Sequence, residues 1–262
     1  MVTVKLILEY LQTLAPVDYK EQWDNVGLLC GHSDREVRRA LIALDPFLDT
    51  AQEACRLGAE LVICHHPLMF SIQSVSDETP LGRTVLYLIE HGLAEISMHT
   101  NLDSAPGGVN DCLARRLGLE HTTVLDAEGT DAMGREYGCG RVGEVAPCSL
   151  ESFLKTVKTQ LQCQGLRYAD AGRPVHKVAV GGGACADYLK KAAQLGCDTF
   201  VTGDVKYNGF ADAVDLGVNL IDAGHFPTEN PVCEYLLEQL EKRFPDVEFF
   251  LSKEHVDVVK FL

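Results

Sequence analysis

The stretch Leu61-Val62-Ile63-Cys64-His65-His66-Pro67 decides the fold of this chain and marks where its chemistry lies. Its first four residues are an apolar run, which predicts a buried strand over 61–64. Pro67 cannot donate to a strand ladder, so the strand is expected to end where the two histidines stand. Neighbouring side chains on a strand point to opposite faces, and His65 and His66 are therefore expected to diverge.

Short apolar runs alternate with helical patterns on both sides of this stretch. Strands are predicted at 40–44, 61–64, 94–98, 175–180, 199–202, 218–223 and 247–251, with helical patterns at 50–57, 84–90, 110–117, 150–161, 185–195, 210–216 and 231–244. This order predicts an α/β fold in which helices cover a largely parallel sheet.

The strand-helix theme occurs in both halves of the chain, which predicts two related α/β domains. We expect mostly parallel sheets covered by helices. The glycine-rich region 126–146 is interpreted as the junction plus a strand or two. The predicted domains are 1–125 and 126–262, and the segment 230–262 is expected to be able to pack back on the first domain.

Imidazoles and carboxylates stand at three of the predicted strand ends. In open α/β sheets, ligands bind at the carboxyl ends of strands. A mixed nitrogen and oxygen set suits divalent zinc, manganese, iron or nickel. Five side chains are the predicted ligands: His65, His66, Asp103, His225 and Glu229. They are more than one tetrahedral ion needs, so two neighbouring ions with a bridging carboxylate are predicted.

His99 also follows a predicted strand, and its residue type leaves three roles open. It could be a ligand, a hydrogen-bonding partner of a ligand, or a proton shuttle. We favour the last two roles because five ligands already serve two ions. The remaining histidines are interpreted as surface or packing residues: His32, His91, His121, His176 and His255.

His225 and Glu229 are four residues apart, which is a spacing typical of one helix face. Pro227 lies between them, and Pro231 suits the first turn of the following helix. We therefore do not expect a helical pair here. Glu229 is instead expected near the amino end of the following helix, where the helix dipole keeps a carboxylate ionised.

Composition limits the classes of partner. Hydrophobic residues make up 46% of the 262, so a large core is possible, and the formal net charge is −15. Sequence-independent binding of nucleic acid or of an anionic membrane surface needs basic patches, and neither is expected. A small phosphorylated substrate is compatible with this charge, because bound metal ions reverse the field locally.

The ten cysteines are scattered and form no Cys-x-x-Cys pair, so a zinc ribbon or a thioredoxin-like motif is not indicated. Such usage is typical of a reduced, cytoplasmic protein. The first fourteen residues include Lys5 and Glu9 within an apolar pattern, which predicts an amphipathic helix and not a signal peptide. No apolar run approaches the ~20 residues that a membrane span requires.

Two further motifs have weaker interpretations. Gly181-Gly182-Gly183 follows a predicted strand, and with Ala186 and Asp204 it fits a loose dinucleotide-binding pattern. Glycines in such turns more often serve geometry alone. The segment Trp23–Gly27 surrounds the only tryptophan and is interpreted as a capped turn with an aromatic anchor.

Taken together, these motifs resemble a known family, the type 2 GTP cyclohydrolase-I homologues, also described as dinuclear-metal-centre hexameric proteins. The resemblance rests on five segments that span most of the chain: WDNVGLLCG (23–31), LVICHHPLMF (61–70), SMHTNLDSAPGGVNDCLA (97–114), VTGDVKYN (201–208) and LIDAGHFPTENP (220–231). Two positions depart from the family pattern. Phe226 stands where the family commonly has tyrosine, and Asn208 stands where many members have histidine.

The resemblance implies two metal ions bound by the same five side chains and His99 near the metals. It also implies two α/β domains with the metal site between them, and a toroidal homohexamer. It also implies a metal-dependent hydrolase in which an activated water attacks a nucleotide or related heterocycle, with a ring opening of GTP as one possibility. A non-enzymatic metal-binding, metal-delivery or regulatory protein is the alternative. A dinucleotide-dependent oxidoreductase is a third hypothesis, and it rests on the glycine run alone.

Overall fold

The computed structural model describes residues 1–262 and divides the chain into two compact units. Unit 1 comprises Met1–Leu102 and Cys233–Val256, and unit 2 comprises Asp103–Val232 and Asp257–Leu262. Unit 2 thus begins well before residue 126, where the sequence analysis placed the second domain. The physical reason is the segment 109–117, whose apolar side chains belong to the core of the second sheet.

Unit 1 is built around a five-stranded sheet in the order β1-β4-β3-β2-β11. Its elements are α1 (Val4–Leu14), a 3-10 turn (Val17–Tyr19), β1 (Gly27–Cys30), β2 (Arg39–Ala43), α2 (Leu48–Leu57), β3 (Leu61–Cys64), α3 (Pro80–Glu90), β4 (Ala94–Ser97), α10 (Pro231–Arg243), whose first residues belong to unit 2, and β11 (Glu248–Leu251). The β11, β2, β3 and β4 strands are parallel, and β1 is antiparallel to β4.

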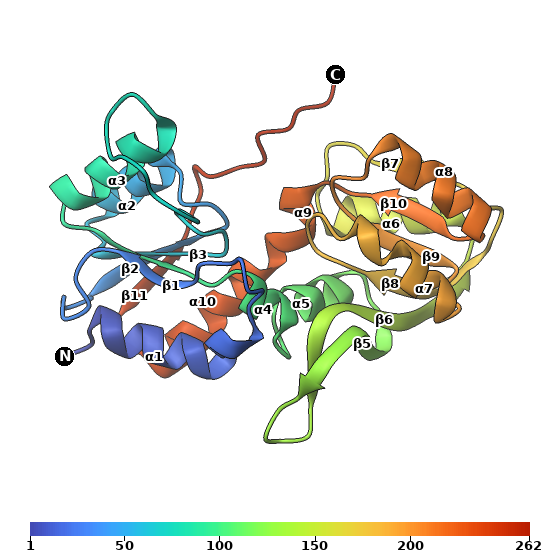
Figure 1. The fold of residues 1–262 in the computed structure, drawn as a ribbon, viewed down its shortest axis with the longest axis horizontal. Coiled ribbons are helices and arrows are strands. Elements are labelled where there is room, and N and C mark those ends of the chain that lie inside the picture. Colours follow the sequence, from blue (N-terminus) through green and yellow to red (C-terminus); the bar gives the residue numbers. More distant parts are fainter. The chain divides into compact units, whose positions relative to one another are not determined.

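The predicted strand 61–64 is confirmed as β3, at the centre of this sheet with both faces buried. Alternate residues serve the two faces. Val62 and Cys64 pack in the apolar cluster that α2 and α3 contribute to. The opposite face, which includes the fully buried Ile63, lies toward α1 and α10 (Figure 1).

Unit 2 is built around a six-stranded sheet in the order β5-β6-β8-β9-β10-β7. Its elements are α5 (Val109–Arg116), β5 (Glu120–Thr130), β6 (Glu136–Cys148), α6 (Leu150–Gln160), β7 (Arg167–Ala169), β8 (Val175–Val180), a 3-10 turn (Ala186–Tyr188), α7 (Leu189–Gln194), β9 (Thr199–Thr202), α8 (Tyr207–Leu216), β10 (Asn219–Asp222) and α9 (His225–Glu229). The short helix α4 (Thr100–Ser104) includes the point where the two units divide.

The second sheet is mixed and not mostly parallel. Only β8, β9 and β10 run parallel, and they form its centre. β5 and β6 form a long antiparallel hairpin, and β7 is antiparallel to β10. The glycine-rich region 126–146, interpreted from sequence as a junction, therefore lies largely within this hairpin. Glycine spacing weakened the alternating pattern by which a strand of this length is normally found.

Helices cover both faces of the second sheet (Figure 1). Val178 and Val201 pack in one cluster with α5 and α6, whereas Ala179 and Phe200 pack in another with α7 and α8. The expected α/β architecture with two helix-covered sheets is confirmed. It leaves the carboxyl ends of β3 and β4 in unit 1, and of β8, β9 and β10 in unit 2, as the strand ends that position polar side chains.

Two further sequence predictions can be compared with the structure. The amphipathic N-terminal helix is confirmed as α1, with Thr3 as its N-cap and Val4, Ile7 and Leu11 buried. None of the helices combines the length and the apolar character required to cross a lipid bilayer. All ten cysteines are free thiols.

Candidate metal-binding site

In unit 1 the three predicted histidines lie together at the ends of β3 and β4. The backbone N–H groups of His65 and His66 both donate to the carbonyl oxygen of Leu44, which turns the chain as β3 ends. Met98 N donates to Cys64 O, which aligns the end of β4 with that of β3. As a result, one ring nitrogen each of His65, His66 and His99 lies within 4.8 Å of the other two.

Each of these imidazoles has its Nδ1 atom next to an oxygen acceptor. The partner of His65 Nδ1 is the carbonyl oxygen of Met98 at 2.8 Å. His66 Nδ1 lies 2.6 Å from Asp45 Oδ1, and His99 Nδ1 lies 2.8 Å from Asp24 Oδ1. A carbonyl or an ionised carboxylate only accepts, so Nδ1 must carry the proton in each contact. The lone pair of each neutral ring is therefore on Nε2, the tautomer that binds a metal through Nε2.

Asp24 is buried and holds His99 and α4 at the same time. Its Oδ2 atom accepts from the backbone N–H of Thr100 at 3.0 Å and also from the Thr100 hydroxyl. Burial by itself raises the pKa of the Asp24 carboxyl, but the hydrogen bonds from His99 and Thr100 outweigh it and hold the pKa well below its usual range. Asp24 is therefore ionised and able to stabilise positive charge on His99.

Asp45, two residues after the end of β2, lies between two imidazoles. Its Oδ1 contacts His66 Nδ1, and its Oδ2 lies 2.8 Å from His255 Nε2. Burial by itself raises the pKa of the Asp45 carboxyl. The hydrogen bonds from His255 and His66 outweigh burial and hold this pKa well below its usual range. His255, taken from the sequence as a surface or packing residue, is thus a buried partner of the carboxylate that orients His66.

In unit 2, His225 and Glu229 do form a helical pair, and the sequence-based expectation was wrong. Both lie in α9, and His225 Nε2 is 3.0 Å from Glu229 Oε2. Pro227 is tolerated because it is in the first turn of α9, where its missing N–H has no intrahelical acceptor. Gly224, with φ of +91°, supplies the turn from β10 into this helix.

Two aspartates complete the polar cluster of unit 2. Asp204, which follows β9, has its Oδ2 atom 2.7 Å from His225 Nδ1 and so determines the ring orientation as Asp45 does for His66. Asp103 lies in α4, and one of its carboxylate oxygens is within 4.8 Å of one from Glu229. Each unit therefore gathers three of the six predicted residues: His65, His66 and His99 in unit 1, and Asp103, His225 and Glu229 in unit 2.

Gly183 is required at the position where it stands. A Cβ atom there would lie 2.1 Å from Glu229 Oε1 and 3.0 Å from His225 Nε2, and its φ of +64° also disfavours other residues. The glycine turn is thus shaped by the two candidate ligands that pack against it.

The backbone N–H groups that a dinucleotide phosphate would need in this turn are not available. Gly181 N donates to Val201 O, Gly182 N to Asn110 Oδ1, and Gly183 N to Thr228 Oγ1. A phosphate-binding glycine loop uses such N–H groups for the ligand. Here they are already engaged by the protein, which counts against the oxidoreductase hypothesis.

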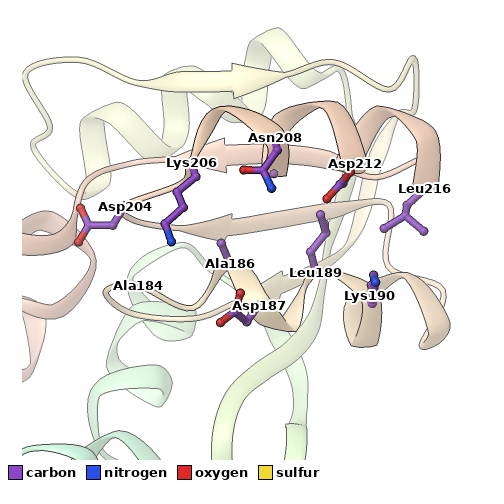
Figure 2. Close-up of a pocket in the computed structure, with 11 residues that line it drawn as sticks. Ala184, Ala186, Asp187, Leu189, Lys190, Asp204, Lys206, Asn208, Asp212 and Leu216 are labelled. Atoms are coloured by element: carbon purple, nitrogen blue, oxygen red, sulfur yellow. The ribbon is translucent and has the colours of Figure 1, made fainter.

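A cavity of about 480 Å³ lies beside Asp204 in unit 2. Figure 2 shows Asp204, Lys206 and Asn208 along one side of it and the turn that carries Ala186 and Asp187 on the other. Asp204, considered from sequence as a ribose-binding acid, instead contacts His225. Asn208, which departs from the family pattern, lines this cavity and belongs to neither ligand group.

Of the orienting carboxylates, Asp24 and Asp45 were missed as functional residues in the sequence analysis, and Asp204 was considered only within the dinucleotide-binding pattern. Asp45 lies two residues after β2 and Asp204 two residues after β9, so the rule that located the histidines could also have located both as candidate ring partners. Asp24 offered no such signal, because the loop before β1 reaches His99 only through tertiary contacts.

Fold and polar clusters together define a class: α/β proteins with histidines and carboxylates at strand ends, in groups that could hold metal ions. Within that class the chain belongs to the Duf34/NIF3 (NGG1p interacting factor 3) family, whose model matches residues 2–257.

Similar proteins extend over the full length of the chain. A Clostridium perfringens protein named GTP cyclohydrolase 1 type 2 homolog is 36% identical over 260 residues, covering 98% of both chains. One of the same name from Clostridium acetobutylicum is 33% identical over 265 residues, again covering 98% of each. Among solved structures, Staphylococcus aureus hypothetical protein SA1388 has a TM-score of 0.91 at 30% identity over 99% of both chains. A Bacillus cereus protein related to NIF3 has a TM-score of 0.94 at 24% identity, covering 100% of this chain and 99% of the other, and supports the fold.

Proposed function

We propose that this protein is a dinuclear metal-dependent hydrolase that acts on a nucleotide or a related nitrogen heterocycle. The observation that carries the proposal is the orientation of the imidazoles. Three of them, His65, His66 and His99, follow β3 and β4 with Nδ1 next to an oxygen acceptor, and one ring nitrogen of each lies within 4.8 Å of the other two. His91 and His176 also have Nδ1 next to a carbonyl oxygen but belong to no such group, so the orientation supports metal binding only together with the gathering of the ring nitrogens.

The donor set fits two divalent ions such as zinc, manganese, iron or nickel. Five residues would hold them: His65, His66, Asp103, His225 and Glu229. Neutral imidazoles and carboxylates are the ligands these ions prefer, and two carboxylates offset part of the charge of two ions. When bound, such ions supply an acidified water for attack and polarise the bond under attack.

His99 is proposed to carry protons in this reaction. Its Nδ1 donates to Asp24, so its Nε2 can accept a proton from the attacking water and later return it to the leaving group. The ionised Asp24 carboxylate stabilises the protonated ring between these two transfers. This pairing of a base with a buried orienting carboxylate resembles the arrangement found in many hydrolases.

The test is turnover by metal-loaded protein with GTP and a panel of nucleotides and bases. We expect product formation that requires the loaded metal and that a His65→Ala, Asp103→Ala double variant abolishes. His99→Gln separates the proposed roles, since a proton carrier loses turnover and keeps its metal, whereas a ligand loses both. Turnover no greater than that of the double variant, with full metal content in the wild-type chain, would refute the proposal.

A homohexamer is part of the same proposal and rests on the sequence resemblance, whereas the proposed cytoplasmic location rests on the scattered cysteines. Sedimentation of the metal-loaded chain tests the assembly. A mass other than six copies would leave the hydrolase proposal standing and refute the assembly.

A second candidate is a protein that stores or delivers metal ions. It is favoured by the side chain of His225, which is 35% exposed and so accessible to an exchanging partner. Transfer of metal to a chelator or an acceptor protein within minutes would support it. Metal that does not exchange over days would exclude it.

A further inference from the structure

Trp23 does not anchor the turn in which it stands. The sequence analysis interpreted this residue, the only tryptophan of the chain, as an aromatic anchor. Its side chain is instead 63% exposed, while the adjacent Asp24 is only 6% exposed. The loop before β1 thus directs the carboxylate inward to His99 and leaves the indole in solvent.

A second exposed aromatic ring lies against this indole. Phe70 is 54% exposed, and its ring centroid is 5.8 Å from that of Trp23 at an interplanar angle of 51°. The two segments are tied together by Asn25 Nδ2, which donates to Met69 O at 2.8 Å. This hydrogen bond holds the loop after β3 against the loop before β1 and so keeps the two rings paired.

Both rings border the proposed proton carrier. The centroid of the His99 ring lies 6.0 Å from the centroid of Trp23 and 6.0 Å from that of Phe70. The ring of His99 meets the ring of Trp23 at an interplanar angle of 74° and the ring of Phe70 at 60°, so neither aromatic ring is stacked on the imidazole. More than half of each aromatic residue stays exposed to solvent beside this imidazole.

Trp23 and Phe70 thus form a pair of large, adjacent aromatic side chains that stay more than half exposed. Such surfaces commonly mark binding sites. Aromatic faces bind the π faces of planar heterocycles, and this stacking tolerates differences among bases. Because the pair borders His99, a ring stacked on it would lie close to the group that moves protons.

We propose that Trp23 and Phe70 form a stacking platform that binds a planar nitrogen heterocycle, such as a purine, beside His99. The inference rests on the proposed hydrolase function for its substrate, and it adds where the base is recognised. Trp23 and Phe70 are substrate-binding residues in this view, because they contact the heterocycle and take no part in proton transfer.

The single tryptophan makes a direct test possible, since all tryptophan fluorescence of the full chain reports on this platform. Metal-loaded protein is titrated with guanosine and, separately, with ribose 5-phosphate, which has no aromatic ring. We expect saturable quenching by guanosine and none by ribose 5-phosphate. Phe70→Leu should weaken guanosine binding by about 5-fold to about 100-fold, from the stacking free energy per base.

Tyr207→Leu is the matched control, because Tyr207 is 90% exposed and lies in unit 2, and it should bind guanosine as the wild type does. Metal content measured in each variant separates loss of stacking from loss of fold. Trp23→Leu removes the fluorescent group, so its guanosine binding is measured by calorimetry. This variant should bind guanosine more weakly than the wild type, to a degree similar to Phe70→Leu.

Three outcomes would overturn the platform: ribose 5-phosphate binding as tightly as guanosine, Phe70→Leu binding guanosine normally, or a tryptophan signal that changes only with protein concentration. The last would assign the rings to contact with a second copy of the chain. Turnover without quenching overturns the platform and leaves the hydrolase proposal standing. Quenching without turnover supports the platform and counts against the hydrolase.

Discussion

Glu95 provides a quantitative test of the packing in unit 1. It lies on β4 with a fully buried side chain. Its Oε1 atom accepts a hydrogen bond from the Ser97 hydroxyl, and its Oε2 atom has no hydrogen-bond partner. Burial raises the pKa of this carboxyl from 4.5 to about 8, and the Ser97 hydrogen bond opposes the change only in part. The folded protein therefore keeps Glu95 protonated at neutral pH.

The sign of the pH dependence follows from this difference. Between 4.5 and about 8, the folded state retains a proton that the unfolded chain has released, so the free energy of unfolding falls as the pH rises through this window. The full gap corresponds to about 5 kcal/mol, as an order of magnitude. Glu95→Gln removes the titration while keeping the shape of the protonated acid.

The assay is urea unfolding of the wild type and of Glu95→Gln at a series of pH values. We expect the free energy of unfolding of the variant, relative to that of the wild type, to rise by about 4 kcal/mol between about pH 5 and about pH 8. Glu90→Gln, which changes an exposed carboxylate on α3, is the matched control and should show no such trend. A stability difference that does not change with pH would refute the reasoning.

The remaining predictions concern the orienting carboxylate, the glycine turn and a buried ion pair. Asp24→Asn should lower kcat by about 100-fold or more with little loss of metal, as steady-state kinetics and elemental analysis would show. Gly183→Ala should reduce metal content sharply, whereas Gly172→Ala, at a similar φ of +71° with nothing within 4 Å, should lose only stability. Arg141 is buried, and its Nε and Nη2 atoms bond Asp111 at 2.9 Å each. Arg141→Met should therefore lower the free energy of unfolding by about 3–5 kcal/mol in urea unfolding.

Local pattern was sufficient for the elements whose residues are uniform in character. The Leu61–Cys64 strand is apolar on both faces because it is central in a parallel sheet. Such a continuous apolar run can be recognised from the sequence without knowing which strands lie beside it. The β5–β6 hairpin could not be recognised from the sequence, because β5 is largely exposed and glycines interrupt both strands. The helix α9 was not predicted because Pro227 was taken to exclude a helix. Whether a proline ends or begins a helix depends on where the first turn starts, and the sequence pattern alone did not show this.

The candidate metal ligands could be chosen from the chain alone, because ligand chemistry belongs to the residue type and the strand ends were visible as apolar runs stopping at histidine. The hydrogen bonds and exposure of those side chains could not. Asp24 and His99 are 75 residues apart, and their hydrogen bond exists because one loop folds onto the end of β4. The same contact places Trp23 outward beside Phe70. Hydrogen bonds and exposure depend on which distant segments meet, and local pattern carries no information about such meetings.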